Sequence, residues 1–76
     1  MARQQMARTD KQIVDEANEL ARMFYLEAGY SQREGYRFDR AFHPQEHHMW
    51  RLACVAMNRL QNTDPEEALS NLEDGQ

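Results

Sequence analysis

The 76-residue chain has few of the residues that interrupt helices, and it has no long apolar run. Three glycines and two prolines leave room for long helices. No apolar stretch approaches the roughly 20 residues that a membrane-spanning helix needs, and the N-terminus lacks the apolar core of a secretion signal. We therefore expect a cytoplasmic protein that makes no contact with a membrane.

Cysteine and the motifs of common enzymes are equally scarce. The single cysteine, Cys54, lies within an apolar helical pattern, where a buried free thiol is more common than a reactive or bridging one. The sequence contains no Ser-His-Asp or Cys-His arrangement, no glycine-rich phosphate loop and no paired-cysteine metal site. We expect neither an enzymatic activity nor a cofactor.

Basic residues are outnumbered and unevenly placed. The chain carries 9 Lys and Arg against 13 Asp and Glu, and residues 62–76 hold only acids among their charged side chains. Because nucleic-acid binding normally needs a basic stripe, nucleic acid is a less favoured partner than protein. A chain this short buries only about 60% of the surface that its unfolded form exposes, so a second copy or another partner could supply missing core.

The first strong pattern predicts a helix over residues 10–28, preceded by a flexible arm at 1–9. Thr9 and Gln12 have the spacing of a capping box, and Gly29 suits the left-handed conformation that ends a helix. The apolar side chains fall on one arc of about 140°. They are Ile13, Val14, Ala17, Leu20, Ala21, Phe24, Tyr25 and Ala28.

Met23 and Leu26 interrupt this pattern because they point to the charged side of the helix. Exposed apolar side chains of this size need an explanation when they lie close together. Either the following loop folds back over them with Tyr30 or Tyr36, or they form a contact with a second copy or a partner. Both readings stay open at this stage.

Two further helices are predicted, over residues 44–62 and 64–73, with a tail at 74–76. Each begins with a proline at its first position, where the missing amide costs nothing, and Asp64 is a good cap for the last helix. The apolar arc of the middle helix is broader, about 200°, which predicts a central helix packed on more than one side. Its members are Met49, Trp50, Leu52, Ala53, Cys54, Ala56, Met57 and Leu60.

The segment His43-Pro44-Gln45-Glu46-His47 matches the H-x-x-E-H pattern of a zinc protease family. Pro44 argues against that reading, because it places His43 outside the helical face on which a metal would need it. Adventitious metal binding by His43, His47 and His48 is a second reading. The third, which we favour, is that these histidines cap the helix and lie on its surface, with no metal bound.

The connection at residues 30–42 is long for a small helical protein, where about 2 to 8 residues are usual. Tyr36 and Phe38 alternate with Arg37 and Asp39, which predicts an extended aromatic segment. Arginine and aromatic residues are enriched in protein interfaces. We therefore predict a partner-binding surface formed by this loop and the polar flanks of the middle helix, comprising Arg33, Tyr36, Arg37, Arg40, His47, His48, Arg51 and Arg59. Alternatively, the aromatics are local core and the arginines pair with Glu34, Asp39 or Glu46.

Several short motifs of the C-terminal half resemble a pattern found in small phage-encoded accessory proteins. They are G-Y-x-F from Gly35, A-x-H-P-Q-E from Ala41 with Trp50 shortly after, and T-D-x-E-x-x-L from Thr63. The resemblance implies no catalytic residue at any position. What it implies is a context, because compact phage proteins commonly bind a host protein and block or redirect it.

Together these observations predict an all-α protein of one domain at residues 10–73. Its two long helices form an antiparallel hairpin with a long ordered aromatic loop between them, and a short third helix docks on it. The expected function is non-enzymatic binding of a host protein or defence complex in the host cytoplasm, with a homodimer as a further possibility. The alternative is a small nucleic-acid-binding or transcription-regulatory module.

Overall fold

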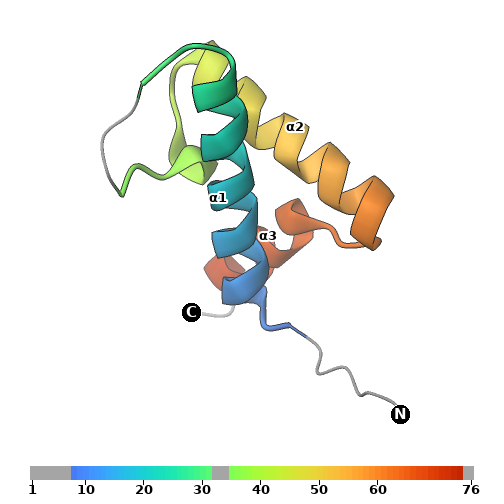
Figure 1. Ribbon diagram of the computed structural model, residues 1–76. Coiled ribbons are helices and arrows are strands. Elements are labelled where there is room, and N and C mark those ends of the chain that lie inside the picture. Colours follow the sequence, from blue (N-terminus) through green and yellow to red (C-terminus); the bar gives the residue numbers. More distant parts are fainter. Residues whose placement is uncertain (1–7, 32–34, 75–76) are drawn as a thin grey trace.

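The computed structural model describes residues 8–31 and 35–74. These residues form three α-helices and one short 3₁₀ helix, with no strand in the ranges described (Figure 1). The elements in chain order are α1 (Asp10–Glu27), η1 (Phe38–Arg40), α2 (Pro44–Gln61) and α3 (Pro65–Asp74). The predicted all-α class, with two long helices and a shorter third one, is confirmed. Each predicted helix boundary lies within one residue of the observed one.

The helix ends follow from local side-chain chemistry. Gln12 N donates to Thr9 Oγ1 at 3.1 Å and Thr9 N donates to Gln12 Oε1 at 2.9 Å, so the predicted capping box is present. Asn62 ends α2 in the left-handed conformation with φ 54°. Asp64 Oδ1 then accepts the Glu66 and Glu67 amides at 3.1 and 3.3 Å, which caps α3 as expected.

The N-terminal arm falls in two parts. Residues 1–7 lie outside the described part of the chain, as do residues 75–76 of the predicted tail. Arg8, in contrast, donates to Gln61 Oε1 at 2.8 Å and to Thr63 Oγ1 at 3.0 Å, and it pairs with Glu16. The chain entering α1 is therefore fastened to the end of α2.

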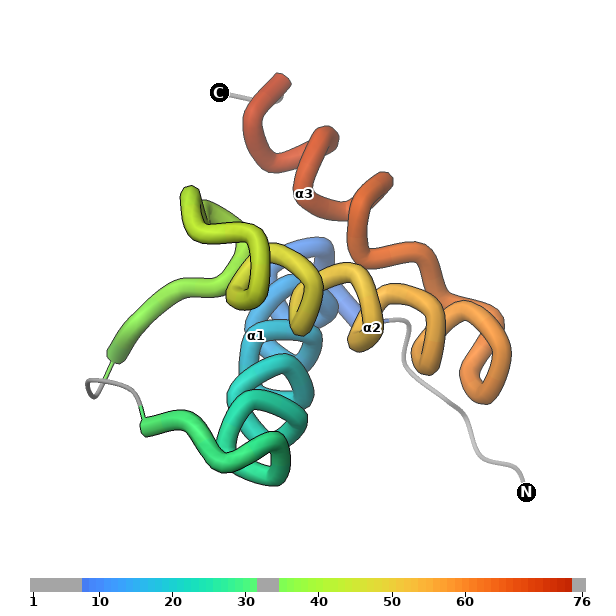
Figure 2. The backbone as a smooth tube through the Cα atoms, turned by 90° about the horizontal axis from the view of Figure 1, so that it is seen from above, coloured from blue at the N-terminus to red at the C-terminus, as the bar shows by residue number. Residues whose placement is uncertain are grey.

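The central helix is α1, which packs against α2, α3 and η1, whereas α2 and α3 contact each other only weakly. Figure 1 shows α2 beginning near the C-terminal end of α1 and slanting away from it, while α3 lies near the N-terminal end. Figure 2 shows α2 and α3 diverging from the turn that joins them. The expectation that the middle helix is central is therefore wrong. Ala17 and Ala21, both fully buried on α1, leave room for neighbours to pack closely.

One core combines side chains from every element. Its larger members are Trp50, Phe38, Met57 and Val14, all at most 2% exposed. Leu52 and Leu60 were predicted to belong to this core, and that prediction is wrong because both are exposed. The physical reason is the position of α3. Since α3 docks on α1, it leaves the outer side of α2 without a cover.

None of the helices in the described ranges is both long enough and apolar enough to cross a membrane. The predicted hairpin loop is ordered at residues 35–43 and contains η1. Residues 32–34 of this loop lie outside the described residues.

Candidate binding surface

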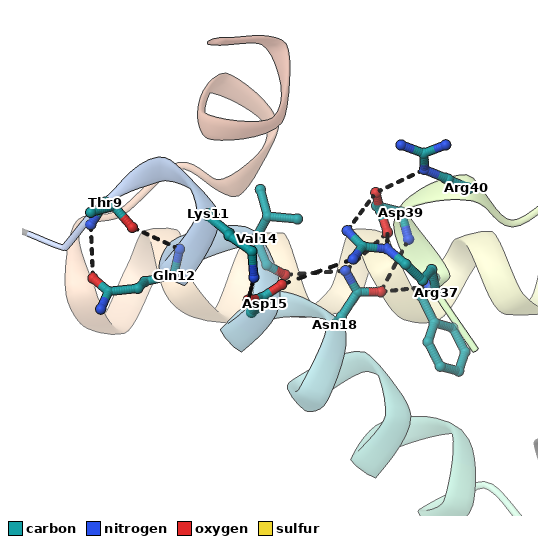
Figure 3. Close-up of polar contacts among 10 residues, drawn as sticks. Thr9, Lys11, Gln12, Val14, Asp15, Asn18, Arg37, Asp39 and Arg40 are labelled. Atoms are coloured by element: carbon teal, nitrogen blue, oxygen red, sulfur yellow. Dashed lines mark hydrogen bonds and ion pairs between the residues drawn. The ribbon is translucent and has the colours of Figure 1, made fainter. Parts of the chain in front are cut away.

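The loop that was predicted to bind a partner is hydrogen-bonded to α1 through the side chain of Asn18. Its Oδ1 accepts the amides of Phe38 and Asp39 at 2.5 and 3.3 Å, and its Nδ2 donates to Asp39 Oδ1 at 2.9 Å (Figure 3). Both amides therefore point to one acceptor, which favours the tight turn of η1. The expectation of an extended chain is correct up to Arg37 and wrong from Phe38 onward.

Two arginines of this loop are paired within the protein. Arg37 Nε lies 3.0 Å from Asp39 Oδ1, and Arg40 Nε lies 3.8 Å from Asp39 Oδ2. The Asp39 side chain has no exposed surface. Its burial alone raises the carboxyl pKa, but hydrogen bonds from Arg37 and Asn18 and the charge of Arg37 outweigh that effect and hold the pKa below its usual range. Arg37 and Arg40 are thus paired with a carboxylate of their own loop.

The aromatic residues of the loop are similarly engaged. Phe38 is fully buried, with Tyr25 and Tyr36 packed edge-on against it at centroid distances of 5.3 and 5.1 Å. Tyr30 stacks on Tyr25 at 4.8 Å. Phe42 is the exception, since it is 95% exposed. Most of the aromatic segment therefore serves as local core, one of the two readings that the sequence allowed.

Glu46, the candidate base of the zinc motif, fastens the loop to α1 instead. The hydroxyl of Tyr25 donates to Glu46 Oε2 at 3.1 Å, and the hydroxyl of Tyr36 donates to Oε1. Burial, together with this carboxylate, raises the pKa of Tyr25. Tyr36 is thus bonded to Glu46 and is partly buried.

The three histidines stand at the start of α2. His43 is the N-cap residue of α2 and lies outside the helix, as predicted, but its side chain makes no capping hydrogen bond, so the expectation that it caps the helix with its side chain is wrong. His47 and His48 are exposed. In the described ranges no three His, Cys, Asp or Glu side chains lie close enough to hold a metal ion.

Met23 and Leu26 remain partly uncovered, with exposures of 53% and 42%. Leu26 lines an open hollow of about 730 Å³ between α1 and the loop, together with Tyr36 and Arg37. Tyr30, the other expected cover, stacks on Tyr25. The loop thus approaches Leu26 but does not bury this pair.

A second hollow, of about 430 Å³, lies on the far flank of α2 where α3 begins. Arg51, Val55, Asn58 and Arg59 line its α2 side, and Asp64 and Glu66 its α3 side. In the part of the chain that the structure describes, neither arginine makes a hydrogen bond or an ion pair. The predicted surface is thus divided: Tyr36 and Arg37 lie in one hollow, Arg51 and Arg59 in the other. Arg33 lies outside the described residues.

Exposed aliphatic side chains continue this flank along α2. Leu52, Val55 and Leu60 are 38%, 60% and 82% exposed. With Ala56 they follow the i, i+3, i+4, i+8 spacing of a single helix face. We call Leu52, Val55, Ala56 and Leu60, together with Arg59 among them and Arg51 at the border, the outer face of α2.

Cys54 and Glu66 form part of the lining of the second hollow. Glu66 Oε2 accepts the Trp50 indole N–H at 3.2 Å and lies 4.0 Å from Cys54 Sγ. Burial, with the nearby charges of Glu66 and Asp64, raises the pKa of Cys54 to about 12, so its thiol stays protonated at neutral pH. Cys54 is buried and makes no disulfide, as predicted, and its side chain packs in the core rather than acting as a reactive thiol.

Sequence reasoning missed two features of these sites. The role of Asn18 was not predicted, because nothing in a single sequence marks an asparagine that bonds to a loop 20 residues away. Leu52, Leu60 and Ala56 were assigned to the core. Their signal was present in the width of the predicted apolar arc, which exceeds what one neighbouring helix can cover.

No protein-family model, curated protein or solved structure shows significant similarity to this chain. The function is therefore argued from the site itself.

Proposed function

We propose that this protein is a non-enzymatic binding protein that attaches to another protein through the outer face of α2. In line with the motifs of its C-terminal half, we propose that it is a phage accessory factor that inhibits or redirects a host protein in the host cytoplasm. The geometry supports a binding role through one contrast in particular, which concerns the arginines.

The single observation that carries the proposal is the state of Arg51 and Arg59. Arg37 and Arg40 share the buried carboxylate of Asp39, whereas Arg51 and Arg59 have no hydrogen-bond or ion-pair partner in the described ranges. They stand beside exposed Val55. Arginine next to apolar surface on a rigid helix is a typical composition for the centre of a protein interface.

A nucleic-acid partner is the alternative, because Arg51 and Arg59 could also contact phosphates. The exposed apolar side chains beside them, Leu52, Val55 and Leu60, are aliphatic, whereas surfaces that bind single-stranded nucleic acid combine arginines with aromatic rings on which the bases stack. Binding of nucleic acid and binding of protein differ in salt dependence. Each contact with a phosphate releases counter-ions from the nucleic acid, so nucleic-acid affinity falls steeply as salt rises. A gel shift with single-stranded and duplex DNA at two salt concentrations separates them, and we expect no shift at either.

The direct test is affinity capture from bacterial lysate with tagged protein, followed by mass spectrometry. We expect a specific partner to be captured by wild type and lost with the double variant Arg51→Ala/Arg59→Ala. The matched control is Arg22→Ala/Arg40→Ala, which removes the same charge from two arginines that pair with Glu19 and Asp39. Circular dichroism on each variant verifies that the fold is intact.

Equal loss of the partner in both double variants would indicate a general charge effect and would contradict the assignment to α2. Capture of nothing specific by wild type would remove the proposed function altogether. Light scattering at high concentration measures the mass of the free protein, and a dimer whose formation is abolished by Met23→Ser/Leu26→Ser would assign that pair to self-association.

A further inference from the structure

The outer face of α2 carries positive charge and no exposed acid. Between Pro44 and Gln61 the only acid is Glu46, and its carboxylate is held by Tyr25 and Tyr36. The exposed charge of α2 is therefore positive, from Arg51 and Arg59. The chain as a whole has a net charge of −4. The positive face thus stands out on an otherwise acidic protein.

Asp64 and Glu66, which line the α3 side of the same hollow, are already used inside the protein. Asp64 accepts the first amides of α3, and Glu66 accepts the indole N–H of Trp50. Their carboxylates are held at the edge of the hollow. They leave the guanidinium groups of Arg51 and Arg59 without a bonded counter-ion in the described ranges.

A second copy of the chain does not suit this face. A symmetric dimer pairs each surface with itself, so two copies joined along α2 would bring four arginines together with no exposed acid on either α2. Like charges placed opposite each other in an interface cost binding energy. The pattern calls for an occupant that combines apolar side chains with carboxylates.

The shape of the face indicates how such an occupant binds. Leu52, Val55, Ala56 and Leu60 lie along one face over just over two helical turns. At 100° per residue, Arg59 falls within this face between Val55 and Leu52, and Arg51 lies at its border. An amphipathic helix lying along such a face buries its own apolar ridge on it. Its flanking carboxylates then reach Arg51 and Arg59.

We propose that the outer face of α2 is the docking site for an acidic amphipathic helix of the partner protein, with leucine-type residues seated on Leu52, Val55 and Leu60 and carboxylates paired to Arg51 and Arg59. This inference rests on the proposed function and specifies the chemistry of the partner. It names a class of segment that can be synthesised and tested without knowing the partner.

The test uses two labelled helical peptides and the full-length protein. Both peptides carry leucines at i, i+3, i+4 and i+7. One has glutamates on both borders of that ridge, and the other has lysines at the same positions. Fluorescence anisotropy measures each dissociation constant. We expect the glutamate peptide to bind at least about 10-fold tighter than the lysine peptide, with the difference shrinking as salt rises.

Charge reversal at the arginines is the sharper arm. With Arg51→Glu/Arg59→Glu we expect the lysine peptide to bind more tightly than the glutamate peptide, a reversal that a loss of folding cannot produce. The control Arg22→Glu/Arg40→Glu introduces the same charge elsewhere and should leave the preference as in wild type.

The apolar contact is tested by Val55→Ser/Leu60→Ser. Because both side chains are exposed, the free protein should keep its thermal stability while its affinity for the glutamate peptide falls by about 10-fold or more. Met23→Ser/Leu26→Ser, which changes the other exposed apolar pair, should leave the affinity unchanged.

Several results would overturn the inference. These are binding of neither peptide, equal binding of both, a preference unaffected by charge reversal, or a dimer in light scattering that Val55→Ser/Leu60→Ser abolishes. If lysate capture depends on Arg51 and Arg59 while the peptide preference is absent, the proposed function stands and this inference fails. If lysate capture fails for wild type, the proposed function itself fails.

Discussion

Two regions of the molecule contain the same residue types: the junction between the loop and α1, and the outer face of α2. The first is paired and buried within the protein, and the second is exposed. Each has two arginines close to apolar side chains. At the junction, Asp39 forms ion pairs with Arg37 and Arg40, and Phe38 is buried in the core. On α2, the arginines have no such partner among the described residues, and the aliphatic side chains stay exposed.

The difference between the two regions comes from what lies opposite each. The loop folds onto α1, where Asn18 supplies hydrogen bonds and Tyr25 supplies apolar surface. Within the described residues, no helix packs on the outer face of α2, because α3 docks mainly on α1. The composition of a segment therefore indicates a surface that can form contacts. Whether those contacts form within the protein or remain open to a partner depends on which element packs opposite.

The largest effect should come from the two phenylalanines of the loop, which test the comparison on one residue type. Phe38→Ala removes a fully buried ring and should lower the free energy of unfolding by about 3 to 5 kcal/mol. Phe42→Ala removes an exposed ring and should change it by less than about 0.5 kcal/mol. Chemical denaturation of the two variants measures both values. Similar losses would show that the loop is not anchored as described.

A second prediction uses the two asparagines that face the two regions. Asn18→Ala leaves the Phe38 and Asp39 amides and a buried carboxylate without their bonds, so unfolding should become easier by about 1 to 3 kcal/mol. Asn58→Ala, on the exposed flank of α2, should alter stability by less than about 0.5 kcal/mol. A neutral Asn18→Ala would mean that η1 forms without this acceptor.

A third prediction concerns pH. The pKa of Asp39 is lowered in the folded state, so its contribution to stability is present above the unfolded value of about 4 and is lost as pH falls through the folded value. Wild type should therefore lose stability on acidification more than Asp39→Asn does. Urea titrations at several pH values between about 2 and 6 measure this difference. Parallel curves for the two proteins would contradict it.

The smallest effect on stability should be that of single arginines. Arg37→Ala removes a half-exposed ion pair to Asp39 and should cost about 0.2 to 1 kcal/mol. Arg51→Ala removes no pair in the described ranges and should cost less than Arg37→Ala. Thermal melts of both variants side by side give the comparison, and a larger loss for Arg51→Ala would reveal an internal role for that residue.

Much of the fold was accessible from the sequence because its signals are local. The capping box at Thr9, the prolines at the starts of α2 and α3, and Asp64 as a cap each act within one helical turn. The buried face of α1 follows from its periodicity. What stayed hidden depends on contacts between distant segments.

Two examples show this limit. The bond from Asn18 to the loop joins residues 20 positions apart, so neither end marks it. The side of α2 that stays exposed depends on whether α3 docks on α1 or on α2, and the apolar residues Ala68, Leu69 and Leu72 of α3 are compatible with either. For the same reason the sequence grouped all the arginines into one surface, whereas the structure separates Arg37 and Arg40 from Arg51 and Arg59.

One experiment tests the division between the two regions most directly: stability and partner capture measured together on Arg51→Ala/Arg59→Ala and on Arg37→Ala/Arg40→Ala. We predict that the α2 variant keeps wild-type stability and loses the partner. The loop variant should lose some stability and, once folded, keep the partner. The opposite pattern, with capture lost only in the loop variant, would contradict the assignment of binding to the outer face of α2.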